Sequence, residues 1–487
     1  MKFKGSGYDM WDAWYLPRGN TIHAFHLKSY PGRGSINVGH LTTRDLVHFE
    51  KQPDVLPLLP EETHPDDCLG KYTGCAYYED GTYYLYYTMR DRYRSEKIGL
   101  ATSRDGVNFT YFDGNPVLTP DETLFVVREK GQKTDCRDML IVKENGIYYG
   151  FFAAMIKDEK CGETGAIGVA TSRDLTHWGN QRIAFKADGG YAVEVPDVFK
   201  LGDTWYLTML TGRMYGAEAV IGDDAFEFAT IYATSDSLDH AFTLHDDRVL
   251  LGGAGKSGYT CRSTVLDGVR YGMYIERGAV SGSISLPKRL DATDGRLRMR
   301  CTDRLVSCRT GKMYTASRTE DFTLVRSSLV WNTYPGRLSS HDVGITLTAH
   351  EAGTQTAYLN EVTVTNAEFA VSLTPAAPLC GFVFRLTDAA GKEQTVRLAF
   401  SKKEQRVTAY TDGIWDKTLL ASRRLDLSGS EERPLRMIVC DDAFELYIAD
   451  ELYLQGAFPT RQTMEIGVFS TGGEASFDGF CVYEWQN

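Results

Sequence analysis

The sequence has no long apolar run and no cluster of basic residues. No stretch of about 18 apolar residues occurs among its 487 residues, so no membrane-spanning segment is predicted. The first nine residues lack the apolar centre of a signal peptide, and we therefore expect a cytoplasmic protein. A net charge of −12 without a Lys/Arg run argues against a nucleic-acid partner.

Paired cysteine motifs are also missing. The ten cysteines are scattered, with no C-x-x-C and no Cys/His pair at zinc-ligand spacing. No Asp-x-Asp-x-Asp loop of the kind that binds calcium occurs either. We therefore predict that the protein uses neither a metal nor another cofactor, and that its thiols are reduced.

Helical periodicity is scarce, whereas tyrosine (28) and phenylalanine (23) are abundant, which favours an all-β fold. Five short stretches repeat a turn followed by an aromatic-rich strand, and their glycines recur every 56 to 66 residues. A repeat of this length is typical of one blade of a β-propeller. The glycines are Gly19, Gly81, Gly146, Gly202 and Gly268.

The length of the chain predicts two domains. We expect a five-bladed β-propeller catalytic domain over residues 1–305, a packed junction over 306–325 and a β-sandwich over 326–487, where about eight short alternating strands follow one another. Three aromatic residues of the second domain, Trp331, Tyr334 and Trp415, are more readily explained by core packing than by binding of sugar chains.

Three acidic residues occupy the same place in their repeats. Asp12 lies 7 residues before Gly19, whereas Asp138 and Glu194 each lie 8 residues before the glycine of their own repeat. If the strands that carry them are innermost, the three carboxylates converge at one mouth of the central channel. Like charges so close should raise the pKa of one of them, as acid/base catalysis near neutral pH requires.

Flat and polar side chains accompany these acids. Arg137 offers a counter-charge beside Asp138, and the aromatic rings near the acids suit sugar binding, although core packing explains each ring alone better than ligand binding does. The expected substrate-binding residues are Arg137, Trp11, Trp14, Tyr72, Thr73, Tyr191 and Tyr259.

Several segments resemble, in order, the motifs of glycoside hydrolase family 32, the β-fructofuranosidase, levanase and inulinase group. They are Val38–Glu50, Asp135–Met139, Val193–Phe199 and Ser285–Leu290. The resemblance implies a five-bladed propeller followed by a β-sandwich, and a retaining hydrolase acting on fructosyl oligosaccharides.

The resemblance also implies catalytic roles. Asp12 takes the place of the nucleophile, Glu194 that of the general acid/base, and Asp138 that of the residue which holds sugar hydroxyls. The segment Met10–Leu16 departs from the family's W-M-N-D-P-N-G, since it lacks both asparagines, the proline and the glycine.

Other functions stay open at this stage. Five-bladed hydrolases of the arabinofuranosidase and xylosidase type also use two Asp and one Glu, and many of them invert the anomeric centre. A carbohydrate-binding protein without activity, or a structural propeller, are the alternatives outside enzymes. The expected partner is an oligosaccharide or small glycoside, and an oligomer is compatible with the sequence.

Overall fold

The protein is built almost entirely of β-strands. The computed structural model describes residues 3–222, 224, 226–253, 258–277, 282–325, 336–351, 353–413 and 417–486. Within these ranges the one α-helix is α1 (Glu218–Ile221), and no helix is long and apolar enough to cross a membrane. Trp331, Tyr334 and Trp415 lie outside the described residues.

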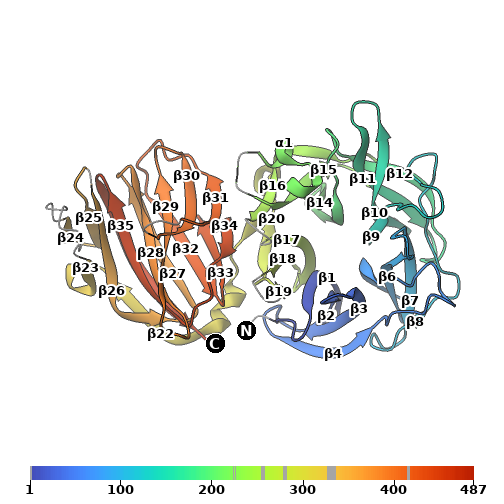
Figure 1. The fold of residues 1–487 in the computed structure, drawn as a ribbon, viewed down its shortest axis with the longest axis horizontal. Helices are drawn as coiled ribbons and strands as arrows, with labels where there is room; N and C mark the ends of the chain where they lie inside the picture. Colours follow the sequence, from blue (N-terminus) through green and yellow to red (C-terminus); the bar gives the residue numbers. More distant parts are fainter. Residues whose placement is uncertain are drawn as a thin grey trace.

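The N-terminal part forms a β-propeller arrangement of antiparallel sheets (Figure 1). Four of these sheets have four strands each, in chain order from the inside outwards. They are β1 (Asp9–Arg18), β2 (Thr21–Tyr30), β3 (Gly34–Thr43) and β4 (Phe49–Val55); β5 (Tyr72–Glu79), β6 (Thr82–Arg90), β7 (Glu96–Ser103) and β8 (Thr110–Tyr111); β9 (Cys136–Glu144), β10 (Ile147–Asp158), β11 (Gly162–Ser172) and β12 (Gly179–Lys186); and β13 (Glu194–Leu201), β14 (Thr204–Gly212), β15 (Phe228–Ser235) and β16 (Thr243–Gly253).

The repeated glycines form the turns after the innermost strands. Asp80 and Gly81, for example, have φ of 47° and 77°. Two left-handed residues in a two-residue turn match the twist of the flanking strands, and Asp-Gly adopts that conformation readily. The first repeated motif of the sequence therefore sets the hairpins from which each sheet grows.

A further group of strands completes the ring. It comprises β17 (Tyr259–Leu266), β18 (Val269–Arg277), β19 (Gly282–Ile284), β20 (Lys288–Asp291) and β21 (Arg298–Arg300). The inner strands contact one another in the order β1, β5, β9, β13 and β17, and β17 returns to β1. The backbone N–H of Gly282, on β19, donates a hydrogen bond to the Asp9 carboxylate, on β1, and so adds a contact where the ring closes.

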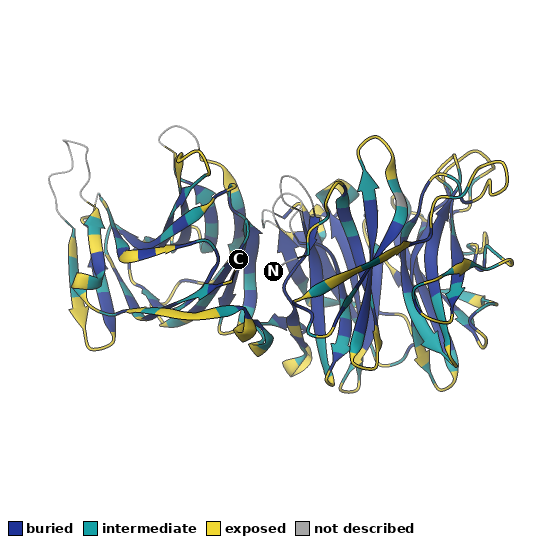
Figure 2. Ribbon diagram, turned by 90° about the horizontal axis from the view of Figure 1, so that it is seen from below, coloured by how far each residue is buried: buried dark blue, intermediate teal, exposed yellow. Residues whose placement is uncertain are grey.

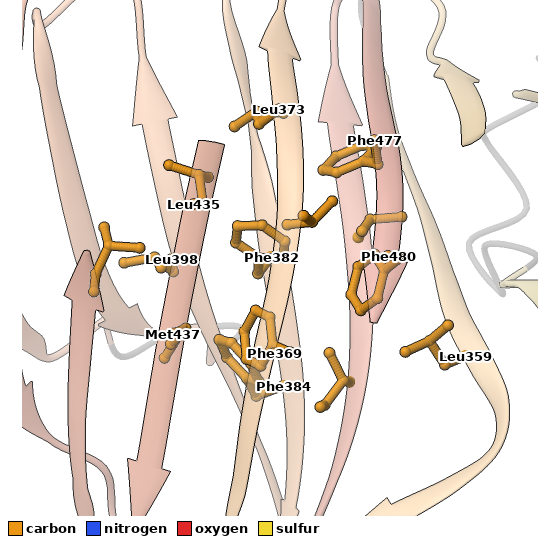
Figure 3. Packing of buried hydrophobic residues seen from close by; sticks show 14 of the residues in the cluster. Leu359, Phe369, Leu373, Phe382, Phe384, Leu398, Leu435, Met437, Phe477 and Phe480 are labelled. Carbon is orange, nitrogen blue, oxygen red and sulfur yellow. The ribbon is translucent and has the colours of Figure 1, made fainter. Parts of the chain in front are cut away.

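The C-terminal part packs two large antiparallel sheets face to face. One contains β22 (Arg309–Ala316), β24 (Arg337–His341), β25 (Gly344–Thr348), β27 (Ala367–Pro375), β32 (Arg433–Cys440), β33 (Ala443–Ile448), β34 (Glu451–Ala457) and β36 (Glu474–Trp485). Through the pairing of β34 with β21, this sheet is continuous with the ring strands β17 to β21. The other contains β23 (Phe322–Val325), β26 (Thr354–Val364), β28 (Leu379–Thr387), β29 (Glu393–Ser401), β30 (Arg406–Thr411), β31 (Leu419–Arg424) and β35 (Thr463–Thr471). Phe369, Phe382, Phe384, Phe477 and Phe480 lie between them and form the core of this part (Figure 3).

The two parts of the chain are packed against each other. Buried residues of both share one apolar cluster, which includes Leu290, Met299, Tyr447 and Trp485. The Tyr274 hydroxyl, on β18, donates to the Glu445 carboxylate, on β33, at 2.7 Å. Buried surface therefore continues from the ring into the C-terminal sheets (Figure 2).

Candidate active site

Every inner strand is interrupted by a β-bulge at the same level. The antiparallel register shifts on each of these strands as follows: Trp11/Ala13, Tyr72/Cys75, Arg137/Leu140, Glu194/Asp197 and Tyr259/Cys261. At four of the bulges a residue other than glycine has left-handed φ: Asp12 (28°), Asp138 (64°), Val195 (50°) and Thr260 (44°). A bulge re-aims the side chains beside it, and backbone strain of this kind collects at functional sites.

The three acids in repeat phase lie in one pocket. Asp12 on β1, Asp138 on β9 and Glu194 on β13 all line a cavity of about 490 Å³. This volume lies in the range of small-ligand sites. Residues 126 and 56 positions apart in the chain thus meet because the inner strands β1, β9 and β13 all border the same pocket.

Asp12 is a buried carboxylate with 8% of its surface exposed. Its Oδ2 accepts a hydrogen bond from the Thr73 hydroxyl, and its Oδ1 has no hydrogen bond of normal geometry in the described part of the chain. Burial raises the pKa of Asp12 to about 6; the Thr73 hydroxyl lowers it, and the negative charge of Glu194 raises it. The Asp12 carboxylate therefore titrates close to neutral pH.

Asp138 is buried more deeply, with 3% exposed. Its Oδ2 accepts the backbone N–H of Val195 at 3.0 Å, and its own N–H donates to Thr88 Oγ1 at 3.1 Å. Burial raises the pKa of Asp138 well above its ordinary value; Arg137 opposes this, and the charges of Glu194 and Asp12 add to it. A raised pKa, expected for one of the three acids, is thus found at both aspartates.

Glu194 is held by two donors. Arg137 Nη2 donates to its Oε1 at 2.7 Å, and the Tyr215 hydroxyl donates to its Oε2 at 2.8 Å. These two bonds fix the direction of the carboxylate within the pocket. Tyr215 comes from a 3₁₀ turn, η1 (Arg213–Tyr215), that follows β14.

Arg137 links the carboxylates into one network. Besides Glu194, its guanidinium contacts Glu96 at 3.0 Å and Asp135 at 2.5 Å, and its Nε lies 3.7 Å from Asp138 Oδ2. One buried cation thus meets four carboxylates, and the pocket floor keeps an excess of negative charge. Such an arrangement favours a positive charge developing on a bound molecule.

Most of the expected substrate contacts line the pocket with the acids. Arg137, Trp11, Tyr72, Thr73 and Tyr259 do so.

Trp14 and Tyr191 do not line this pocket, contrary to the expectation from their phase. Trp14 is 1% exposed and packs in an apolar cluster with Phe25, while Tyr191 is 2% exposed and packs with Val193. Full burial of a large ring between sheets is the more favourable place for these two side chains.

Nine residues that line the pocket were not found from the sequence, and four of them carry large polar side chains: Tyr215, Arg33, Arg90 and Arg94. They come from the ends and connections of the outer strands, where the repeat sets no phase. A search for arginines just after the aromatic strands would have found Arg90 and Arg94.

Within the described ranges, no group of three or more His, Cys, Asp or Glu side chains is arranged to hold a metal ion. His23 and His40, which are close in space, bond to each other at 3.0 Å and stack as packed rings.

Comparison with known proteins gives this site a family context. Residues 19–248 match the family described as the glycosyl hydrolases family 32 N-terminal domain. The match covers a little less than half of the chain, and this segment is similar to the N-terminal domain of that family. The matched segment includes Asp138 and Glu194. Asp12 precedes it, and Asp12 lies in Met10–Leu16, the segment that departs from the family's motif.

Among curated proteins, the chain is similar to a sucrose-6-phosphate hydrolase of Escherichia coli, with 29% identity over 228 residues. That match covers 45% of this chain and 43% of the relative, so the chain spans less than half of the relative's length.

Solved structures are similar to this chain over almost its whole length, beyond the matched residues 19–248. A Bombyx mori GH32 beta-fructofuranosidase mutant in complex with sucrose has a TM-score of 0.66 and 16% identity, covering 99% of this chain and 94% of that one. An exo-inulinase from Aspergillus awamori has a TM-score of 0.68 and 15% identity, covering 100% and 98%. At this level of identity the two structures show a shared fold.

Proposed function

We propose that the protein is a retaining glycoside hydrolase that cleaves β-fructofuranosidic bonds. The observation that carries this proposal is the meeting of Asp12, Asp138 and Glu194 in one pocket, with Asp138 and Glu194 inside the segment that matches family 32. The substrate is a fructosyl oligosaccharide or a small fructoside. The names of the relatives and the sucrose in the Bombyx mori structure support this substrate class.

The proposed reaction has two steps. Glu194 donates a proton to the leaving oxygen while an oxygen of Asp12 attacks the anomeric carbon, so that a covalent fructosyl ester forms as the glycosidic bond breaks. Glu194 then takes a proton from water, whose oxygen displaces Asp12 and releases fructose.

The other polar groups of the floor position the substrate in this proposal. Asp138 and Arg137 hold ring hydroxyls, and the negative floor stabilises the oxocarbenium-like transition state. Trp11, Tyr72 and Tyr259 present ring faces or edges to the sugar, and Thr73 keeps Asp12 oriented.

We also propose a five-bladed architecture for the N-terminal part. We assign β17, β18, β20 and β21 as a fifth blade beside the four separate sheets, with the catalytic propeller over residues 1–305, a junction over 306–325 and a β-sandwich over 326–487. The closed order of five inner strands supports the fifth blade.

A substrate screen tests the proposal. The purified protein is incubated with sucrose, inulin, levan and an aryl arabinofuranoside, and release of reducing sugar is measured. Release from a fructoside supports the proposal, whereas release only from the arabinofuranoside contradicts it. With methanol present, a retaining enzyme forms methyl β-fructofuranoside, and formation of the α-anomer would contradict retention.

Two variants test the roles of the residues. Asp12→Asn and Glu194→Gln should each abolish turnover while circular dichroism stays unchanged. Asp113→Asn and Glu122→Gln alter exposed acids of the segments after β8 and should keep full activity. Undiminished hydrolysis by Asp12→Asn or Glu194→Gln would show that the roles are wrong.

A further inference from the structure

The five inner strands enclose a second cavity, beyond the catalytic acids. Each of β1, β5, β9, β13 and β17 lines the active-site pocket with its first residues and the second cavity with later ones. On β1, for example, Asp12 lines the pocket, whereas residues 14–18 line the second cavity together with Gly19 of the hairpin turn. This turn-end cavity has a volume of about 600 Å³, in the range of small-ligand sites.

Three arginines line the turn-end cavity: Arg18, Arg262 and Arg270. In the described part of the chain, none of them forms an ion pair with a carboxylate. Arg18 Nη2 donates to the Tyr78 hydroxyl at 3.0 Å, and Arg270 Nη1 donates to Ser263 Oγ at 2.9 Å. Their positive charges therefore remain without a bound counter-charge.

The other charged residues of this cavity do not balance the arginines. Lys143 is paired with Glu79 at 2.7 Å, and Lys200 with Glu144 at 3.9 Å. Among the described lining residues the one carboxylate is Asp197, whose Oδ2 accepts a backbone N–H of β17 at 2.8 Å. The turn-end cavity thus carries an excess of positive charge, although the whole chain has a net charge of −12.

Arg262 is the most deeply buried of the three arginines, with 2% of its surface exposed. Its Nη2 donates to the backbone carbonyl of Asp138 at 3.1 Å, whereas its Nε and Nη1 have no hydrogen-bond partner in the described ranges. Burial also lowers the pKa of Arg270, and the charge of Asp197 opposes that shift. Buried cations with unmet N–H groups are costly, and a bound anion relieves this cost.

Further lining residues carry buried polar atoms that lack a hydrogen-bond partner among the described residues. All of these atoms can donate a hydrogen bond, and an indole N–H can only donate. A water molecule must donate as well as accept, whereas an anion only accepts, so donors beside excess positive charge favour an anion. The atoms are Trp14 Nε1, Tyr15 Oη, Trp205 Nε1 and Thr264 Oγ1.

We infer that the turn-end cavity binds a small anion, a halide or a short carboxylate, beside Arg262 and Arg270. This site is separate from the sugar pocket, and its existence does not depend on the proposed function. Arg262 contacts Asp138 of the active site and also lines the turn-end cavity, so it connects the anion to the catalytic acids.

An anion beside Arg262 should change the titration of Asp12. The charge of Arg262 lowers the pKa of Asp12, and a bound anion weakens this effect. Asp12 then keeps its proton to higher pH, and turnover at acidic pH should fall. The charged and titratable groups around Arg262 are Asp12 on β1, Cys75 on β5, Asp138 on β9, Asp197 on β13, Cys261 on β17 and Arg270 on β18.

Iodide quenching of tryptophan fluorescence tests the site without turnover, because Trp14 and Trp205 line the cavity. Quenching should contain a saturable component in addition to the linear collisional one. Arg270→Gln should raise the half-saturating iodide concentration at least about 10-fold, and Arg270→Lys should raise it less. Arg173→Gln, an exposed arginine in the connection between β11 and β12, should behave as the wild type. Linear quenching of the wild type, or unchanged saturation in folded Arg270→Gln, would overturn the inference.

Two further measurements locate and identify the anion. In crystals grown with bromide, anomalous scattering should place the ion beside the Arg262 or Arg270 guanidinium, and a turn-end cavity that holds water alone would overturn the inference. Acetate is then titrated against bound iodide. Displacement by acetate identifies a carboxylate site, and resistance to acetate identifies a halide site.

Kinetics test the connection to the active site, and this experiment alone rests on the proposed function. Chloride should lower kcat/KM on a fructoside about 5-fold or more at pH 5, below the pKa of Asp12, and should have no effect at pH 8. Arg270→Gln should be insensitive to chloride, whereas Arg173→Gln should respond as the wild type does. An equal chloride effect in Arg270→Gln would overturn the connection through this site. If no fructoside is hydrolysed, the proposed function fails, and iodide quenching still decides whether the anion site exists.

Discussion

Replacing the Asp12 carboxylate should stabilise the fold while abolishing turnover. Its pKa rises from the ordinary 3.8 to about 6 in the folded protein, mainly through burial. At 1.36 kcal/mol for each unit, ionised Asp12 costs the folded state about 3 kcal/mol. Asp12→Asn removes that cost, its carbonyl oxygen can still accept from Thr73, and asparagine tolerates the left-handed backbone at this position.

The sign of the pH dependence follows from linkage. Between pH 3.8 and about 6 the folded protein keeps a proton that the unfolded chain has lost, so stability falls as the pH rises through this window. Above about pH 6 the full cost is present, and below about pH 4 it is absent. Asp12→Asn should therefore be more stable than the wild type by about 3 kcal/mol at pH 8, and the difference should vanish near pH 4.

Urea unfolding followed by tryptophan fluorescence at pH 4, 5, 6 and 8 measures this difference. Titrating groups remote from the pocket act on both proteins and cancel in the comparison. Asp138, whose pKa the Asp12 charge raises, does not cancel and changes the difference in the same direction. Asp113→Asn controls for the removal of an exposed carboxylate. A stability difference that stays constant with pH, or that is larger at pH 4 than at pH 8, would refute the reasoning.

Three further changes probe the same site. Thr73→Val removes the hydroxyl that lowers the pKa of Asp12, so the acidic limb of the kcat/KM profile should move to higher pH; an unmoved limb would contradict the role of this bond. Tyr215→Phe leaves Glu194 Oε2 without its donor and should lower kcat about 10-fold, measured on sucrose 6-phosphate, whereas an unchanged kcat would exclude a positioning role. Gly74→Ala places a methyl group against the carbonyl oxygen of Tyr86, so urea unfolding should show a loss of at least about 1 kcal/mol, and full retention of stability would mean that β5 can move.

The sequence is sufficient to predict the ring because its turns repeat. Gly19, Gly81 and their counterparts mark hairpins, and position relative to a turn translates directly into position around the ring. For that reason the shared position of Asp12, Asp138 and Glu194 before their turns is sufficient to predict that the three side chains meet at one pocket.

The positions of Tyr215 and of the pocket arginines Arg33, Arg90 and Arg94 could not be predicted in the same way. Arg33, Arg94 and Tyr215 belong to connections whose path depends on packing, and the phase of the repeat carries no information there. Position within the repeat also cannot distinguish an aromatic side chain that faces the pocket from one that packs between sheets. For this reason the prediction that Trp14 and Tyr191 line the pocket does not match the structure.

The second domain was predicted less completely. About eight short strands are predicted over residues 326–487, whereas the described residues there form the 13 strands β24 to β36. Among them β26 runs from Thr354 to Val364. Glu361 has a left-handed φ of 58° at a register shift, and this bulge breaks the alternation on which the prediction depended.

The five bulges place one residue of each inner strand at an equivalent position around the ring, which we call a seat. Four of them share a left-handed residue, yet its identity differs: Asp12, Asp138, Val195 after Glu194, and Thr260, while the fifth bulge holds Thr73. A change of chemistry at the centre therefore requires one substitution at a prepared position and no rebuilding of the scaffold. A library confined to these seats would explore new reactions while sparing the hairpins on which folding depends.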